Sequence, residues 1–373
     1  MSTKNSHRKD PGHTFGDPAG NREVAVSTGT SIWKALDERL GISDFAYPVP
    51  RHANTLAYSL GGISVIGFLV LILTGILLAQ FYHPMPQFAN DSVRAMMQGI
   101  RLERILRGIH YWAAQVVVLT VLLHMIRVFT TGSFKRPREA NWIIGVGLLA
   151  TTIGLFFTGT VLKWDQEGFE ALEHNIAIGE LLGRLGYWFT PGFTENVPLL
   201  LRLYLAHVSI LPGILVLLLL VHFWLIKKHG ISPLPGRPVD GYVPFTKHLK
   251  HLGKYGLVLV GIVLLLAVVL PPVVGPAPVE GIEVTKPPWP FLPLFAVENW
   301  IGIPGLFWAS VVLFGLFLLV PFVDRSPDAA PGKRRAFIAL GLILLLVLVG
   351  LGLLAWLTPG AEHVGGSISA GRA

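Results

Sequence analysis

Apolar residues in this chain form long unbroken runs, unlike the alternation of a half-buried strand or the single stripe of a surface helix. Seven runs approach the length of about 20 residues that a helix needs to cross a bilayer. They lie near 56–81, 108–130, 140–162, 203–227, 254–274, 304–323 and 335–357. The pattern therefore predicts an all-α, polytopic membrane protein with seven transmembrane helices.

Polar segments divide these runs into a group of four and a group of three. The connection 163–202 contains WDQEGFEALEHN and predicts short surface helices, while 275–303, rich in Pro, Val and Trp, predicts a folded, functional connection. A basic linker separates the two groups of helices. We predict a polar, disordered tail, a four-helix part, the linker, a three-helix part and a flexible tail, over 1–32, 33–230, 231–253, 254–358 and 359–373.

Residues 31–42, SIWKALDERLGI, place Trp33, Leu36 and Leu40 at helical spacing. This spacing predicts a short amphipathic helix, which either lies on the membrane surface or packs as an ordinary helix.

Composition and charge support the membrane assignment. The chain of 373 residues is 52% hydrophobic and only 14% charged, whereas a soluble domain is about 25% charged. The net charge of +8 lies in loops such as FKRPRE, KHLKHLGK and DRSPDAAPGKRR, which indicates cytoplasmic loops and no nucleic-acid partner. We expect the cytoplasmic membrane of a prokaryote, with the N-terminus cytoplasmic and the C-terminus outside. The absence of cysteine excludes disulfides and covalent haem c on this chain.

Two of the predicted spans carry a histidine pair. HYWAAQVVVLTVLLH has His110 and His124, and HVSILPGILVLLLLVH has His207 and His222. Fourteen helical steps fall about 40° short of four turns, and fifteen overshoot by about 60°, so each pair lies roughly on one face and about 21 Å apart. Because both spans enter the bilayer from outside, His110 and His207 share an outer level. His124 and His222 share an inner level.

Histidines facing each other at two levels are the axial-ligand arrangement of two stacked, non-covalent b haems. The alternative is that each histidine hydrogen-bonds across helices or lies at the interface. Four ionisable residues at matched levels favour the haem interpretation, because such residues are rare within spans and usually functional.

Neighbouring residues fit haem slots. Arg107 and Arg127 lie three residues from a histidine and can reach haem propionates, although they can also extend to lipid headgroups. Glycines recur fourteen residues apart in two other spans and offer close backbone approach at both levels, or simply close helix packing. These glycines are Gly61, Gly75, Gly145 and Gly159.

The chain resembles cytochrome b of the quinol-oxidising cytochrome bc and b6f complexes, from about residue 33 to 358. The motifs that carry the resemblance to cytochrome b6 are SLGGISV, RGIHYW, TGSFKRPREANWIIGVGLL, TGTVLKWDQ, LRLYLAHVSILPG and HFWLIKKHGIS. The three-helix part is similar to subunit IV of b6f. The resemblance implies haem-iron ligand pairs His110–His207 and His124–His222, a homodimer, and Rieske-type iron–sulfur and c-type cytochrome partners. It also implies quinone as substrate.

The chain departs from the family in three places. Ser59 stands where b6 has a cysteine that anchors an extra haem, and Lys163 replaces the proline of the PWDQ-type turn. The PEWY motif reads Pro287-Pro288-Trp289-Pro290, so the glutamate thought to accept a proton from quinol is missing.

Two functions fit these observations. The first is a dihaem cytochrome b subunit of a quinol–cytochrome c reductase-like oxidoreductase, with an outer quinone site near Lys163, Trp164, Asp165, Pro288 and Trp289. Asp165, Glu167 and Glu298 are candidates for the missing proton acceptor, although each one singly is more typical of a solvated loop carboxylate. The second is a non-bifurcating dihaem electron conduit between the quinone pool and a partner dehydrogenase or reductase. A haem-free transporter or scaffold is a third class, which the matched histidine levels disfavour.

Overall fold

The computed structural model describes residues 31–41, 43, 46–99 and 101–364. Most of the two predicted tails lies outside these residues. Among them, seven helical segments are long and apolar enough to cross a membrane, which confirms the predicted all-α class and span number. Strands in the described part are limited to β1, Val49–Pro50, and β2, Tyr242–Val243, which pair antiparallel with Val49 opposite Val243.

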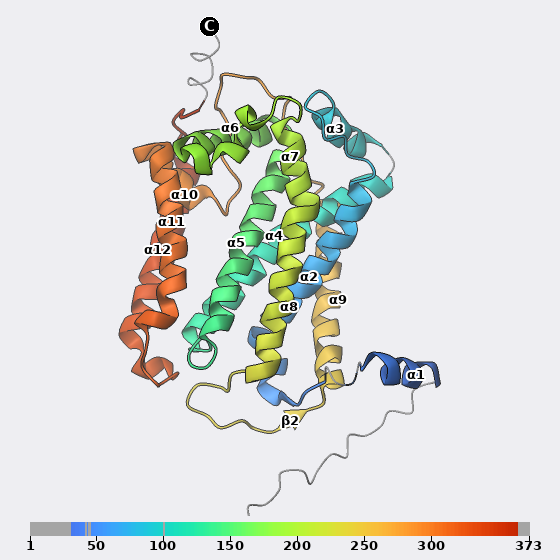
Figure 1. Cartoon of the computed structure of the whole chain (residues 1–373), viewed down its shortest axis with the longest axis vertical. Coiled ribbons are helices and arrows are strands. Elements are labelled where there is room, and N and C mark those ends of the chain that lie inside the picture. Colours follow the sequence, from blue (N-terminus) through green and yellow to red (C-terminus); the bar gives the residue numbers. More distant parts are fainter. Residues whose placement is uncertain (1–30, 42, 44–45, 100, 365–373) are drawn as a thin grey trace, which may run out of the picture. The chain divides into compact units, whose positions relative to one another are not determined.

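The first four spans form a bundle (Figure 1). They are α2, Leu56–Leu78; α4, Arg101–Thr130; α5, Glu139–Val161; and a fourth that begins with α7, Leu199–Leu205, passes through a π-helical turn at Ala206–Ile210 and continues as α8, Leu211–His229. Helix α2 packs mainly on α4, and α5 on α8. A Cβ atom at Gly67 would lie 2.3 Å from Val117 Cγ2, so the α2–α4 contact requires a glycine.

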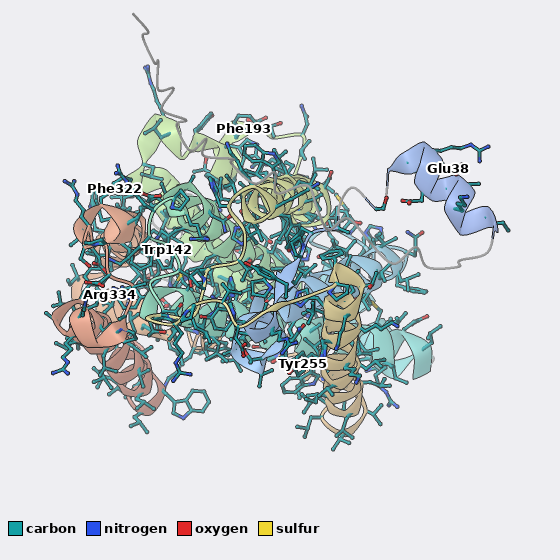
Figure 2. The ribbon with its side chains drawn as sticks, turned by 90° about the horizontal axis from the view of Figure 1, so that it is seen from below. Glu38, Trp142, Phe193, Tyr255, Phe322 and Arg334 are labelled. Carbon is teal, nitrogen blue, oxygen red and sulfur yellow. The ribbon has the colours of Figure 1, made fainter. Side chains whose placement is uncertain are left out.

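The last three spans are α9, Phe245–Val269; α11, Ile303–Val323; and α12, Arg335–Leu357. They flank the bundle on opposite sides: Tyr255 of α9 lies far from Phe322 and Arg334 of the α11–α12 side (Figures 1 and 2). The Trp112 indole donates to the Leu270 carbonyl (2.8 Å) on one side, and Trp142 donates to Phe317 (2.7 Å) on the other.

Short helices cover one end of the bundle, which we call the α6 end. They are α3, Ala89–Gln98; α6, Gln166–Leu181; and α10, Leu292–Ile301, with 3-10 turns at Gly183–Leu185, Tyr187–Phe189 and Pro191–Phe193. The opposite end, which we call the β2 end, holds the sheet and 3-10 turns at Arg51–Asn54 and Pro331–Lys333. The short surface helices predicted after 163 are therefore present.

The three basic loops meet at the β2 end. The hydroxyl oxygens of Ser133 and Ser232 lie 2.6 Å apart, and Lys135 Nζ lies 2.6 Å from Asp324 Oδ1. The loops that the lysine and arginine pattern assigned to one side of the membrane are thus in contact with each other.

The predicted starts of two spans need correction. Helix α4 begins at Arg101 rather than near 108, because the charged residues of RLERILR lie in its first turns. Helix α9 begins at Phe245 rather than near 254, because the basic residues of KHLKHLGK lie in its first turns. The first residues of the tail predicted from 359 make defined contacts up to 364. The buried carboxylate of Glu283 accepts the backbone N–H groups of His363 and Val364 (2.6 and 3.1 Å) and holds this segment.

Helix α1, Ser31–Leu40, belongs to a separate compact unit and is described by itself. It confirms the predicted helix. Its Ile32 and Leu40 side chains are exposed.

Candidate functional site

The histidines of the two spans face each other across the bundle. His110 on α4 and His207 in the π-helical turn have ring centres 6.3 Å apart at the level nearer the α6 end. The second level holds His124, against Gly61 of α2, and His222, against Gly145 of α5. The sequence spacing and the tertiary structure therefore agree on two levels.

The π-helical turn corrects the rotation in the fourth span. Fifteen regular helical steps would overshoot four turns by about 60°. A π-helical turn takes up one extra residue, so the separation of His207 and His222 acts like the fourteen residues of α4. Pro212, which lacks an N–H group and crowds the preceding turn, accounts for the irregular turn at Ala206–Ile210.

Two threonine hydroxyls orient His110 and His207, the pair nearer the α6 end, which we call the upper level. His124 and His222 form the lower level. Thr74 donates to the Val70 carbonyl (2.7 Å) and lies 2.9 Å from Nδ1 of His110. Thr158 donates to Gly154 (2.9 Å) and lies 2.9 Å from Nδ1 of His207. When each hydroxyl donates to its backbone carbonyl, its oxygen is left to accept the N–H at Nδ1. Both Nε2 atoms are then unprotonated and can bind a metal ion.

The four predicted glycines each lie against one histidine. A Cβ atom would come within 3.0 Å of His124 Cε1 at Gly61, 3.3 Å of His110 Cε1 at Gly75, 3.9 Å of His222 Cε1 at Gly145 and 3.1 Å of His207 Cε1 at Gly159. Helices α2 and α5 thus back the histidines of α4 and the fourth span.

This donor set fits haem iron. Two imidazole nitrogens on opposite sides of one metal ion, each at about 2 Å, place their ring centres about 6 Å apart, close to the 6.3 Å of the upper pair. At the lower level, Nδ1 of His124 is buried and has no hydrogen-bond partner among the described residues.

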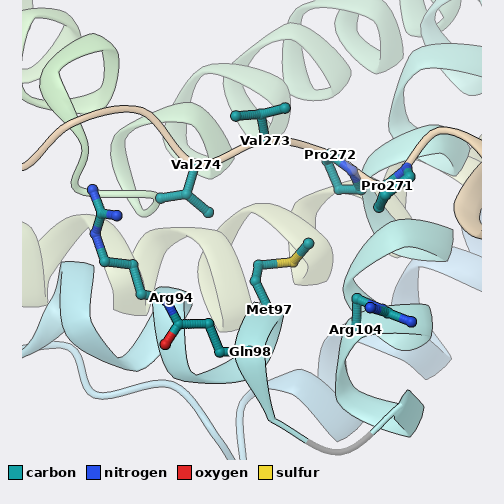
Figure 3. A pocket seen from close by; sticks show the side chains of 8 residues that line it. All are labelled: Arg94, Met97, Gln98, Arg104, Pro271, Pro272, Val273 and Val274. Carbon is teal, nitrogen blue, oxygen red and sulfur yellow. The ribbon is translucent and has the colours of Figure 1, made fainter.

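The two predicted arginines differ in their contacts. Arg107 is buried and donates to the Pro272 carbonyl and the Met97 sulfur, both at 3.0 Å. Met97 and Pro272 also line a hollow of about 340 Å³ at the α6 end, between α3 and the segment that follows α9 (Figure 3). Arg127 stacks on the Tyr58 ring at 4.3 Å, and its buried Nε has no partner among the described residues.

The turn after α5 places three predicted residues of the outer quinone site. Trp164 has a left-handed φ of 50°, and its carbonyl accepts a hydrogen bond from Asn90 (2.9 Å). Asp165 accepts the backbone N–H groups of Gly168 (3.0 Å) and Gly275 (2.9 Å), so it caps α6. Lys163 pairs with Glu167.

The PPWP segment, residues 287–290, lies against helices α4 and α5 of the bundle. The Pro288 carbonyl accepts the Phe291 N–H (2.9 Å), and the Trp289 indole donates to Gln115 of α4 (2.8 Å). The Phe291 ring packs edge-on against Phe156 and Phe157 of α5. These contacts place the segment within reach of both α4 and α5.

Sequence reasoning missed several residues of this region. The two threonines precede glycines in repeated Thr-Gly pairs, 74–75 and 158–159, and Pro212 signalled the irregular turn. Glu298, a predicted candidate, is 1% exposed, and its Oε1 lies 2.9 Å from Nε2 of His174. The segment EALEH carries the signal for His174, but its pattern predicts only a surface helix.

Comparison with known proteins places these features in a family. A profile described as Cytochrome b/b6/petB matches residues 45–230. Cytochrome b6 of Heliobacterium modesticaldum is 37% identical over 207 residues, which cover 53% of this chain and 97% of that protein. Cytochrome b6 of Prochlorococcus marinus is 34% identical over 216 residues, covering 56% and 99%.

A solved structure extends the likeness of the fold beyond the four-helix part. One chain of a hyperthermophilic respiratory complex III superposes with a TM-score of 0.74 at 24% identity, covering 87% of this chain and 91% of that chain. The flanking helices therefore also have a counterpart in a known fold.

Proposed function

The chain belongs to the cytochrome b/b6 family, and on that premise we propose that it is the dihaem cytochrome b subunit of a membrane quinol oxidoreductase of the bc or b6f type. The observation that carries the proposal is the pair His110–His207, 6.3 Å apart with both Nδ1 atoms bound by threonine hydroxyls. In this proposal His110 and His207 hold the outer b haem, and His124 and His222 hold the inner one.

A b haem, when bound, supplies a reversible one-electron iron couple. Residues of the chain orient the histidines and shape the space around them. Thr74 and Thr158 fix the tautomer of the upper histidines, and the glycines of α2 and α5 leave room beside all four rings. Arg127 has a buried N–H free for an acidic group, which suits a haem propionate. Arg107 already donates to protein groups, so its role is to hold the segment after α9.

The proposed sidedness follows from charge. The contacting basic loops at the β2 end would face the cytoplasm, and the α6 end, with the turn after α5 and the PPWP segment, would face outside and hold the outer quinol site. The membrane would be the cytoplasmic membrane of a prokaryote. A Rieske-type iron–sulfur protein, a c-type cytochrome and a second copy of the chain are the proposed partners.

Pro288 also supports a second candidate. Its backbone lies in a turn and offers no carboxylate for quinol, so a non-bifurcating dihaem conduit to a partner dehydrogenase or reductase is the alternative. Adding oxidant to the purified complex, with the inner quinone site inhibited, should reduce the b haems if quinol oxidation is bifurcated. No haem reduction under these conditions would favour the conduit, and a protein without b haem would contradict both.

Replacing Thr158 with valine should raise the midpoint potential of one b haem and leave the other unchanged. A hydrogen bond to Nδ1 makes the opposite nitrogen a stronger ligand for the ferric state, and valine cannot accept it. Thr152→Val is the matched control, because Thr152, on the same helix, donates only to the Leu148 carbonyl (2.7 Å). Potentiometric titration of the haem spectrum measures both variants, and equal potentials would contradict the assignment.

A further inference from the structure

A buried cluster of carboxylates surrounds one imidazole at the α6 end. Nε2 of His174, on α6, lies 2.9 Å from Glu298 Oε1 and 3.4 Å from Glu283 Oε1. Glu298 is 1% exposed and Glu283 is 8% exposed. Neither the haem positions nor the helix contacts described above require ionisable groups here, and burying them costs free energy unless they are paired.

The geometry shows that the cluster holds a proton. Nδ1 of His174 lies 2.7 Å from the Glu170 carbonyl, which can only accept, so Nδ1 carries a hydrogen. Nε2 then faces two carboxyl oxygens. Since a bare nitrogen lone pair would repel two carboxylates, we infer that Nε2 is protonated as well. With the imidazole charged and both glutamates ionised, the three groups carry one net negative charge and can accept one more proton.

The titration behaviour is consistent with this arrangement. Burial lowers the pKa of His174, but the carboxylates of Glu283 and Glu298 outweigh burial and raise it to about 10. Burial raises the pKa of Glu173 to about 7. Glu173 is 3% exposed, and its Oε2 has no hydrogen-bond partner among the described residues. A group with this pKa takes up and releases protons near neutrality.

The same face of α6 is bonded to the segment that precedes the PPWP motif. The Glu170 carboxylate accepts the backbone N–H groups of Val284 (2.8 Å) and Thr285 (2.9 Å). Thr285 lies two residues before Pro287. Glu298 stands on α10, which begins at Leu292 directly after the motif. The cluster therefore adjoins the chain on both sides of the position where the glutamate is missing.

The other two candidates for the missing acceptor are already occupied. Both oxygens of Asp165 receive backbone N–H groups. Glu167 pairs with Lys163, whose Nζ also lies 3.6 Å from Asp165. Glu298 differs from both because its partner, His174, can exchange a proton with it.

We propose that Glu298, paired with the charged His174, accepts protons released by quinol at the α6 end and passes them outward, replacing the carboxylate that Pro288 lacks. This inference rests on the proposed function. When a quinol O–H bond breaks, the electron leaves to a one-electron iron acceptor, namely the iron–sulfur partner or the b haem. The proton forms an O–H bond on Glu298, because both ring nitrogens of the charged His174 already carry a hydrogen. Glu173, electrostatically coupled to the exposed Glu280, returns it to water.

The pH dependence involves the titratable groups around the imidazole and its glutamate neighbours among the described residues. These groups are Glu170 and Glu173 on α6, Glu280 and Glu283 in the preceding segment, Glu298 on α10, and His363 beyond α12.

The test compares Glu298→Gln and Glu173→Gln with Glu180→Gln in the whole complex. Glu180 is exposed near the end of the same helix and controls for the change of charge. We expect Glu298→Gln to lower kcat for quinol oxidation at pH 7 at least about tenfold, since a positioned proton acceptor is typically worth about 10²–10⁴-fold. KM should change little, and Glu298→Asp should restore part of the rate. Infrared difference spectra, recorded across a pH titration without quinol, should lose a carboxylic acid band in Glu173→Gln.

The possible outcomes are distinct. Normal rates and unchanged pH profiles in both glutamine variants would overturn the relay and leave the cluster as a clamp between α6 and α10. If Glu298→Gln loses haem or folds poorly, Glu173→Gln decides, because Glu173 takes part in neither of the ion pairs that His174 makes. If the unchanged complex fails to oxidise quinol, both the proposed function and the relay are wrong.

Discussion

Replacing His124 with alanine is expected to remove one b haem and to leave the other in place. His124 and His222 form the lower level, separate from the pair His110–His207. An alanine cannot bind iron, and Gly61, which backs the His124 ring, would then face a cavity. The ratio of haem to protein, measured from extracted haem, should fall to about half that of the unchanged protein, because each level provides one bis-histidine site.

His83→Ala is the control for this experiment. His83 is exposed at the α6 end and packs on Phe88, away from the facing pairs. An unchanged haem ratio in His124→Ala, or the loss of both haems, would contradict the assignment of levels.

Replacing Asp324 with asparagine is expected to destabilise the protein by about 3–5 kcal/mol, the usual effect of removing one partner of a buried ion pair. Asp324 Oδ1 lies 2.6 Å from Lys135 Nζ, and Oδ2 lies 2.5 Å from Arg334 Nε, with side-chain exposures of 6%, 10% and 1% for the three residues. Arg334 also donates to the Phe129 carbonyl (3.1 Å), so the aspartate joins α4, α11 and α12 at the β2 end.

Asp328→Asn provides a matched control on the same loop. Asp328 pairs with Lys333, and both side chains are largely exposed, so the loss should stay below about 1 kcal/mol. Thermal unfolding of the detergent-solubilised protein, followed by circular dichroism, compares the variants. Equal unfolding temperatures for Asp324→Asn and Asp328→Asn would show that the buried network contributes nothing.

The same aspartate makes stability depend on pH. Burial acts to raise the pKa of Asp324, but the hydrogen bonds and charges of Lys135 and Arg334 outweigh it and lower the pKa below the ordinary 3.8. A carboxyl group whose pKa is lower in the folded state stabilises at pH values above its unfolded pKa. The contribution is lost as the pH falls through the folded pKa. The difference between unchanged protein and Asp324→Asn should therefore be full at pH 7 and shrink in strong acid.

Local pattern predicted the spans and the histidine levels. A helix that crosses a bilayer must satisfy its own backbone hydrogen bonds, so the seven apolar runs could form little other than helices. Helical geometry then placed His110 and His124, fourteen residues apart, on one face. The four glycines against the histidine rings follow from the same periodicity.

The sequence pattern did not predict the irregular backbone of the fourth span or the start of α9. The fifteen-residue separation in the fourth span implied a mismatch of about 60°, which the π-helical turn at Ala206–Ile210 takes up. Helix α9 begins earlier than the hydropathy pattern predicts, because the basic residues in its first turns lower the local hydropathy.

By itself, the sequence determined the membrane class, the seven helices and the two histidine levels, because each follows from interactions between residues a few turns apart. Only the tertiary structure decided that α9 and the α11–α12 pair flank the bundle on opposite sides. Only the tertiary structure, too, brought His174, Glu283 and Glu298 together. These three residues lie on separate elements more than a hundred positions apart at the extreme. No local periodicity relates them, so their proximity depends on how α6, α10 and the connecting segment pack.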